Sequence, residues 1–190
     1  MMQTFRDLVA LTVVRPAEAM AQILALGLTV RLSWVVLVIG TMLSTLAIFA
    51  RVLAFPVELF PGVMFLDVVT PFGLFVTLTI VAATSAVLLT FSGRYLGGQG
   101  SFATVLSYVA WLQVMRAVVE GLGLLVSFAS FGLAVLAINL AGLYAIWIIL
   151  NFQRVAHGFE TNGRTIGSLV LTFVGILVVV SLLLAPFISV

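Results

Sequence analysis

The sequence contains no cysteine and no lysine, and it has few charged residues of either sign. Without cysteine the chain can form no disulfide, no thiolate metal site and no iron–sulfur cluster. Charged residues make up only 7% of the 190 positions, whereas an ordinary soluble domain has about 25%. The formal net charge of +2 indicates no basic surface for nucleic acid, and no nucleic-acid partner is predicted.

Hydrophobic residues, in contrast, make up 64% of the chain. A water-soluble fold cannot bury that much apolar surface. Five membrane spans of about 22 residues would use about 110 residues, which leaves little for any extramembrane domain. The composition therefore predicts an all-α fold, a polytopic transmembrane helical bundle that forms a single membrane domain over residues 1–190.

The spans are placed between charges, because a charge at the centre of a span costs about 2.5 to 3.5 kcal/mol. The stretch from residue 102 to residue 150 is interrupted by Arg116 and Glu120. Dividing it there leaves one piece too short to cross and another that would be about 45 Å long, well beyond the roughly 30 Å core. Two spans joined by a tight turn solve both problems and place Arg116 and Glu120 inside the third span. The predicted spans are about 32–50, 70–92, 102–125, 131–150 and 165–187.

The arginines also predict an orientation, because short cytoplasmic loops collect basic residues. With five spans and a cytoplasmic N-terminus, only Arg51 lies in an outside loop. A four-span alternative would place three arginines outside, so five spans are favoured. The arginines predicted to be cytoplasmic are Arg6, Arg15, Arg31, Arg94, Arg154 and Arg164.

Residues 1–31 are predicted to be a cytoplasmic or interfacial segment with an amphipathic helix that begins at Pro16. Its apolar residues recur at helical spacing, which is typical of a helix lying in the membrane interface. Such a helix either anchors the chain or offers a docking surface to a partner. A signal peptide is the alternative, because the apolar run Leu8 to Val14 precedes Ala17-Glu18-Ala19, which has the small-x-small form of a cleavage site. Arg15 interrupts that pattern.

Arg116 and Glu120 form the candidate intramembrane polar cluster, together with Asn139 of the fourth span. The i,i+4 spacing puts Arg116 and Glu120 on one helical face, where they can neutralise each other. Asn139 could bond to this pair across the helix interface. The pair is interpreted as a structural ion pair, with a transport route as the functional alternative.

The remaining polar features indicate no catalytic, cofactor-binding or metal site. The glycine-rich segment 93–102 lacks the Lys-Ser/Thr of a P-loop and is predicted to be a tight turn in which Ser101 caps the third span. His157 is the only histidine and is interpreted as a solvated loop residue. A lone histidine supplies neither paired haem ligands nor a three-ligand zinc site.

The layout resembles the Yip family, the Ypt-interacting proteins, in its bacterial branch. The segment Arg15 to Ala19, five closely spaced spans and the turn from Leu96 to Phe102 carry the resemblance. Eukaryotic members are associated with Rab GTPases and vesicle traffic. Their long cytoplasmic N-terminal extension is not part of this sequence, so GTPase binding is not carried over. The resemblance implies a fold, no catalytic residues, and a place in the bacterial inner (cytoplasmic) membrane.

These observations predict a non-enzymatic scaffold, adaptor or accessory subunit of a larger membrane assembly. Its predicted partners are the lipid bilayer and other integral membrane proteins, and the sequence leaves homo-oligomerisation open. The alternative is a small transporter or channel component that uses Arg116 and Glu120. No cofactor is predicted.

Overall fold

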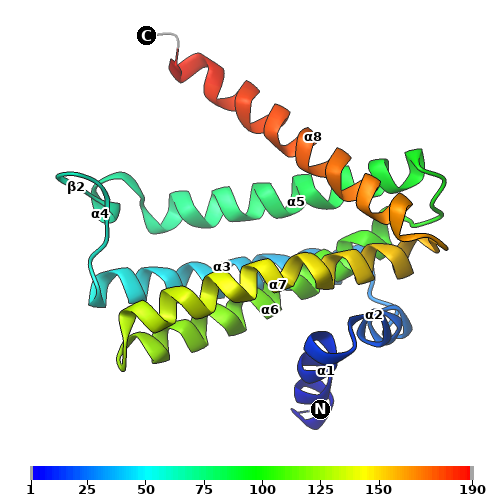
Figure 1. Cartoon of the computed structure of the whole chain (residues 1–190), viewed down its shortest axis with the longest axis horizontal. Helices are drawn as coiled ribbons and strands as arrows, with labels where there is room; N and C mark the ends of the chain where they lie inside the picture. The colour runs from blue at the N-terminus through cyan, green and yellow to red at the C-terminus, as the bar shows by residue number, and fades with distance from the viewer. Residues whose placement is uncertain (1, 189–190) are drawn as a thin grey trace. The chain divides into compact units, whose positions relative to one another are not determined.

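The structure, a computed structural model, describes the backbone of residues 2–188 and the side chains of residues 5–179 and 181. Within this range the chain is almost entirely helical, and Figure 1 shows its elements in chain order. The helices and strands are α1 (Met2–Val14), α2 (Pro16–Ala25), α3 (Val30–Ala54), β1 (Glu58–Phe60), β2 (Val63–Met64), α4 (Phe65–Val68), α5 (Pro71–Tyr95), α6 (Phe102–Ser127), α7 (Phe131–His157) and α8 (Asn162–Ile188).

Five of the helices in the described part of the chain are long and apolar enough to cross a membrane. They are α3, α5, α6, α7 and the Asn162–Val179 part of α8, with mean hydropathies between 1.6 and 2.3. A helix of 25 residues, the length of α3, is about 37 Å long and exceeds the hydrocarbon core. The predicted fold class, an all-α polytopic bundle with five spans, is confirmed.

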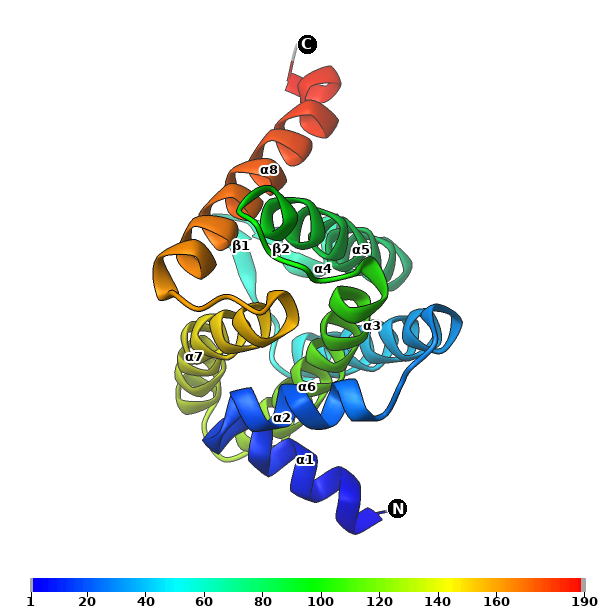
Figure 2. The same cartoon turned by 90° about the vertical axis from the view of Figure 1, so that its right-hand side faces the viewer.

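The N-terminal segment forms two helices, α1 and α2, which meet at an angle (Figure 2). The second begins at Pro16, as predicted, because proline is favoured in the first turn of a helix. Its buried face includes Met20 and Ile23. The small-residue segment Ala17 to Ala19, considered above as a cleavage site, lies within α2.

Two of the helices end in the same glycine-dependent motif. Gly97 follows α5 with a φ of 87°, and Gly158 follows α7 with a φ of 65°. In each case the N–H of the next residue bonds back to a carbonyl five residues earlier, from Gly98 to Gly93 and from Phe159 to Arg154. This is the Schellman arrangement, which needs a left-handed residue. These motifs stop α5 and α7 sharply and reverse the chain into α6 and α8.

The predicted cap at Ser101 is confirmed, because its Oγ accepts the Thr104 N–H at 3.1 Å at the start of α6. The predicted tight turn between α6 and α7 spans only residues 128–130. Gly123 and Ser127 lie inside α6, and Ser130 caps α7 by accepting the Leu133 N–H at 3.4 Å.

The loop between α3 and α5 contains a small hairpin that was not predicted from the sequence. Strands β1 and β2 pair antiparallel across a turn at Pro61-Gly62, where Gly62 has a φ of 80°. Proline followed by a left-handed glycine is typical of a type II turn. The Phe65 ring of α4 packs edge-on against Phe49 of α3 at 5.8 Å and so ties this loop to the end of α3.

The chain folds into two compact units. Unit 1 contains α1, α2, residues 83–108 and the residues from 148 onward; unit 2 contains residues 30–82 and 109–147. The core of unit 1 includes Ile23, Leu106 and Phe152, which are all fully or almost fully buried. In unit 2, α3 lies so close to α6 that a Cβ on Gly40 would overlap Gln113.

Candidate functional site

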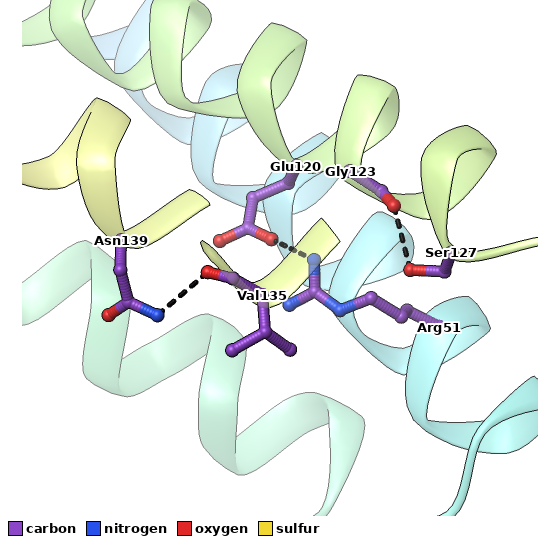
Figure 3. Close-up of polar contacts among 6 residues, drawn as sticks. All are labelled: Arg51, Glu120, Gly123, Ser127, Val135 and Asn139. Carbon is purple, nitrogen blue, oxygen red and sulfur yellow. Dashed lines mark hydrogen bonds and ion pairs between the residues drawn. The ribbon is translucent and has the colours of Figure 1, made fainter. Parts of the chain in front are cut away.

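Unit 2 contains an ion pair between the half-buried Arg51 near the end of α3 and the buried Glu120 of α6. The Arg51 Nη1 lies 2.8 Å from the Glu120 Oε2, and the two side chains are only 14% and 8% exposed. Figure 3 shows the Arg51 guanidinium pointing at the Glu120 carboxylate. Each charge neutralises the other away from water, so the pair ties α3 to α6.

The predicted pairing of Glu120 with Arg116 is wrong, although both residues are on α6. Arg116 is exposed, and among the residues that the structure describes it takes part in no ion pair. The i,i+4 spacing identifies neighbours on one helix but contains no information about a cation on another helix. Glu120 turns into the contact with α3, where it meets the half-buried Arg51.

Asn139 also lies apart from the pair. Its Nδ2 donates to the Val135 carbonyl of its own helix at 2.8 Å, and the residue is exposed on α7 (Figure 3). A hydrogen bond to the carbonyl four residues back satisfies the amide locally. The bond considered above, from Asn139 across the helix interface to Glu120, is therefore not formed.

Gly123 provides the space that the ion pair needs. A Cβ at this position would overlap the Ile138 side chain of α7 and would lie 3.2 Å from the Arg51 Nη1. Ser127 donates to the Gly123 carbonyl at 2.7 Å one turn later (Figure 3). A glycine here therefore lets α6 approach α7 while Arg51 reaches Glu120.

Unit 1 contains a second polar cluster, centred on the fully buried Gln153 of α7. The Tyr108 hydroxyl of α6 donates to its Oε1. Its Nε2 donates to the Leu89 carbonyl of α5 at 2.9 Å and contacts the Ser168 Oγ of α8 at 2.8 Å. Ser168 in turn is hydrogen-bonded to Ser92 at 2.8 Å. One amide side chain thus connects four helices, a role that was not predicted from the sequence.

His157 is buried, so its interpretation as a solvated loop residue is wrong. Only 2% of the residue is exposed, and its Nδ1 accepts the Gly100 N–H at 3.2 Å. A Cβ at Gly93, Gly98 or Gly100 would overlap the imidazole ring. We call these three glycines the histidine socket. The spacing of the glycines in segment 93–100 was the available signal, but it did not indicate what they enclose.

The Arg51–Glu120 ion pair and the hydrogen bonds of Gln153 connect helices, and nothing in their chemistry names a reaction. Comparison with known proteins, in contrast, identifies a family. A family model described as the Yip1 domain matches residues 10–183, which include all of the side chains described above. The chain belongs to the Yip1 domain family. The resemblance stated from the sequence is thereby confirmed at the level of the family.

The Yip1 domain accounts for most of the chain and includes all five candidate spans, namely α3, α5, α6, α7 and the Asn162–Val179 part of α8. This Yip1 domain protein is an integral, multi-pass membrane protein whose spans contact the lipid bilayer. Neither curated proteins nor solved structures yield a match to the chain.

Proposed function

We propose that this Yip1 domain protein is a non-enzymatic adaptor or accessory subunit that binds another integral membrane protein, in the bacterial inner membrane. The observation that carries the proposal is the position of Arg116. It is exposed on α6, about 21 Å from the start of the helix and about 16 Å from its end. The arginine side chain is too short to reach the bilayer surface easily from that depth.

A cation at that depth needs an anion, because a charged side chain at the centre of a span costs about 2.5 to 3.5 kcal/mol. Glu120 cannot supply the anion, since its carboxylate already binds Arg51 at 2.8 Å. Within the described residues α6 therefore presents one uncompensated positive charge. A partner helix with an aspartate or glutamate at the same depth would neutralise it.

The exposed face of α7, the helix that follows α6 in unit 2, suits a partner within the membrane. Only 11% of the apolar window of α7 is buried within the chain. In unit 2 its exposed leucines recur at helical spacing, at Leu133, Leu136, Leu140 and Leu143. Helices associate in the membrane through close packing and polar contacts rather than through hydrophobic burial. Arg116 would give such an interface its specificity.

Copurification tests the proposal. The wild-type chain and the variants Arg116→Leu and Arg116→Lys are extracted in a mild detergent, and the stoichiometric companions are identified by mass spectrometry. We expect a companion with a carboxylate in a span, retained by Arg116→Lys and lost from Arg116→Leu. Arg31→Leu is the matched control, because Arg31 is exposed at the start of α3 and should not affect the companion.

Two results would overturn this function. The first is a wild-type chain that purifies alone or only with further copies of itself. The second is solute or ion flux across liposomes that contain the chain alone, provided that Arg116→Leu abolishes the flux. That second result would assign Arg116 to an aqueous path and would favour the transporter alternative.

A further inference from the structure

Three arginines lie around two neighbouring turns of unit 1, at the end where α5 and α7 finish and α6 and α8 begin. Arg94 is in the last turn of α5, Arg154 is in the last turn of α7 and Arg164 is in the first turn of α8. All three are exposed, and none forms an ion pair among the described residues. Glu160 is the one acidic residue in these turns, so three positive charges and one negative charge leave a local charge of +2.

The backbone of the turns orients two of these arginines. The Arg94 Nε donates to the Gly100 carbonyl at 3.0 Å. The Arg154 Nε donates to the Phe159 carbonyl at 3.4 Å. The Arg154 Nη1 also donates to the Asn162 Oδ1 at 3.4 Å. The Nη2 of Arg154 and both terminal nitrogens of Arg94 have no partner among the described residues. The Arg164 Nη1 lies 3.9 Å from the point that a Cβ on Gly97 would occupy, so it reaches the same turn.

The turns that carry the arginines are held firmly. The Gln99 N–H donates to the His157 carbonyl at 3.0 Å, and the Gly100 N–H donates to the His157 Nδ1. The histidine socket thus joins the turn after α5 to the end of α7. Arginines presented from such a turn lose less conformational freedom on binding than arginines on a mobile loop.

From this arrangement we infer that the three arginines form a binding site for the phosphate of an anionic phospholipid headgroup. Guanidinium groups bind phosphate oxygens in a bidentate manner, and basic pockets between the ends of transmembrane helices bind anionic headgroups. The position also matches the bilayer surface. Tyr95, which is 83% exposed, follows Arg94, and the exposed apolar side chains of α8 begin at Ile166, as expected at a membrane interface.

The experiment uses the full-length chain in a mild detergent and counts bound lipid by native mass spectrometry. The probes are phosphatidylglycerol and phosphatidylcholine. The wild-type chain should retain phosphatidylglycerol in preference to phosphatidylcholine. Each single substitution Arg94→Gln, Arg154→Gln or Arg164→Gln should weaken phosphatidylglycerol binding at least about fivefold, since each removes hydrogen bonds from a charged donor to the phosphate. Arg31→Gln, the exposed arginine at the start of α3, should leave the binding unchanged.

A triple lysine variant, R94K/R154K/R164K, separates a built site from simple charge. It keeps the +2 charge of the turns but loses the bidentate geometry, so we expect it to bind more weakly than the wild type. Equal binding by the lysine variant, or an equal loss in Arg31→Gln, would overturn the site. Inorganic phosphate that binds as tightly as the lipid, with the same dependence on these arginines, would assign the site to a soluble anion and would overturn the lipid assignment.

All three arginines are exposed, so their replacement should leave the fold intact. Unfolding by a denaturing detergent checks this for each variant. A triple glutamine variant that unfolds like the wild type but still retains phosphatidylglycerol selectively would also refute the inference.

Discussion

Replacing Arg51 or Glu120 should destabilise the protein strongly, because each replacement leaves the other charge buried without its partner. The two side chains are 14% and 8% exposed, and their charged atoms are 2.8 Å apart. We choose Arg51→Met and Glu120→Leu, which keep approximate size and remove the charge. Arg116→Met is the matched control on α6, because Arg116 is exposed and lies four residues from Glu120.

The magnitude follows from the geometry. At 2.8 Å two unit charges attract each other by about 6 kcal/mol at an effective dielectric constant of about 20. Desolvation of both groups offsets much of that attraction, so the net contribution of the pair is small, whereas removing one partner costs about 3 to 5 kcal/mol. We therefore expect each single variant to lose at least about 3 kcal/mol and the double variant Arg51→Met/Glu120→Leu to regain most of that loss.

The assay is reversible unfolding of the purified protein in mixed micelles, titrated with a denaturing detergent and followed by the fluorescence of its tryptophans. A double-mutant cycle of Arg51→Met and Glu120→Leu should give a coupling energy of at least about 4 kcal/mol, because two single losses of at least about 3 kcal/mol each are replaced by a small loss in the double variant. The parallel cycle with Arg116→Met should give a coupling below about 0.5 kcal/mol, since Arg116 makes no ion pair with Glu120. Arg116→Met alone should not reduce stability, because it removes an unpaired charge from the middle of a span.

The opposite ranking of the two coupling energies would refute this reasoning. If the coupling of Glu120 to Arg116 exceeds its coupling to Arg51, then Glu120 pairs with Arg116, as the i,i+4 spacing predicts, and not with Arg51 of α3. A coupling to Arg51 below about 0.5 kcal/mol would show that the pair does not tie these helices together.

Three further predictions concern the other contacts and use the same unfolding assay. Gln153→Leu removes three hydrogen bonds within unit 1 and should lower the stability by about 2 kcal/mol, at about 0.6 kcal/mol for each bond. An unchanged unfolding midpoint would show that Gln153 does not link these helices. Gly93→Ala should lower the unfolding midpoint because its Cβ overlaps the His157 ring. Part of that loss should be regained by adding His157→Ala, which removes the ring, whereas Gly142→Ala, which has open space around it, should be neutral. Gly40→Leu should separate α3 from α6 and cost at least about 1 to 3 kcal/mol, and wild-type stability would count against their close approach.

Much of the fold could be predicted from the sequence, because span formation depends on local quantities. The energy of inserting a helix is close to a sum over its residues, so the lengths of the apolar intervals and the position of each charge were enough to predict five spans. Local capping chemistry is likewise visible in the sequence: Pro16 begins α2, and Ser101 caps α6. The hairpin between α3 and α5 was missed because its strands have only three and two residues.

The candidate sites required the tertiary structure, because they depend on distances between residues far apart in the chain. Sequence spacing identified Glu120 as a membrane-embedded acid but paired it with Arg116, whereas the packing of α3 against α6 brings in Arg51, 69 positions away. In the same way, the glycines of segment 93–100 predicted a turn, and only the folded chain places the His157 ring among them. Hydropathy along the chain thus determined how many times this protein crosses the membrane, while helix packing decided which charges are neutralised and left Arg116 facing outward.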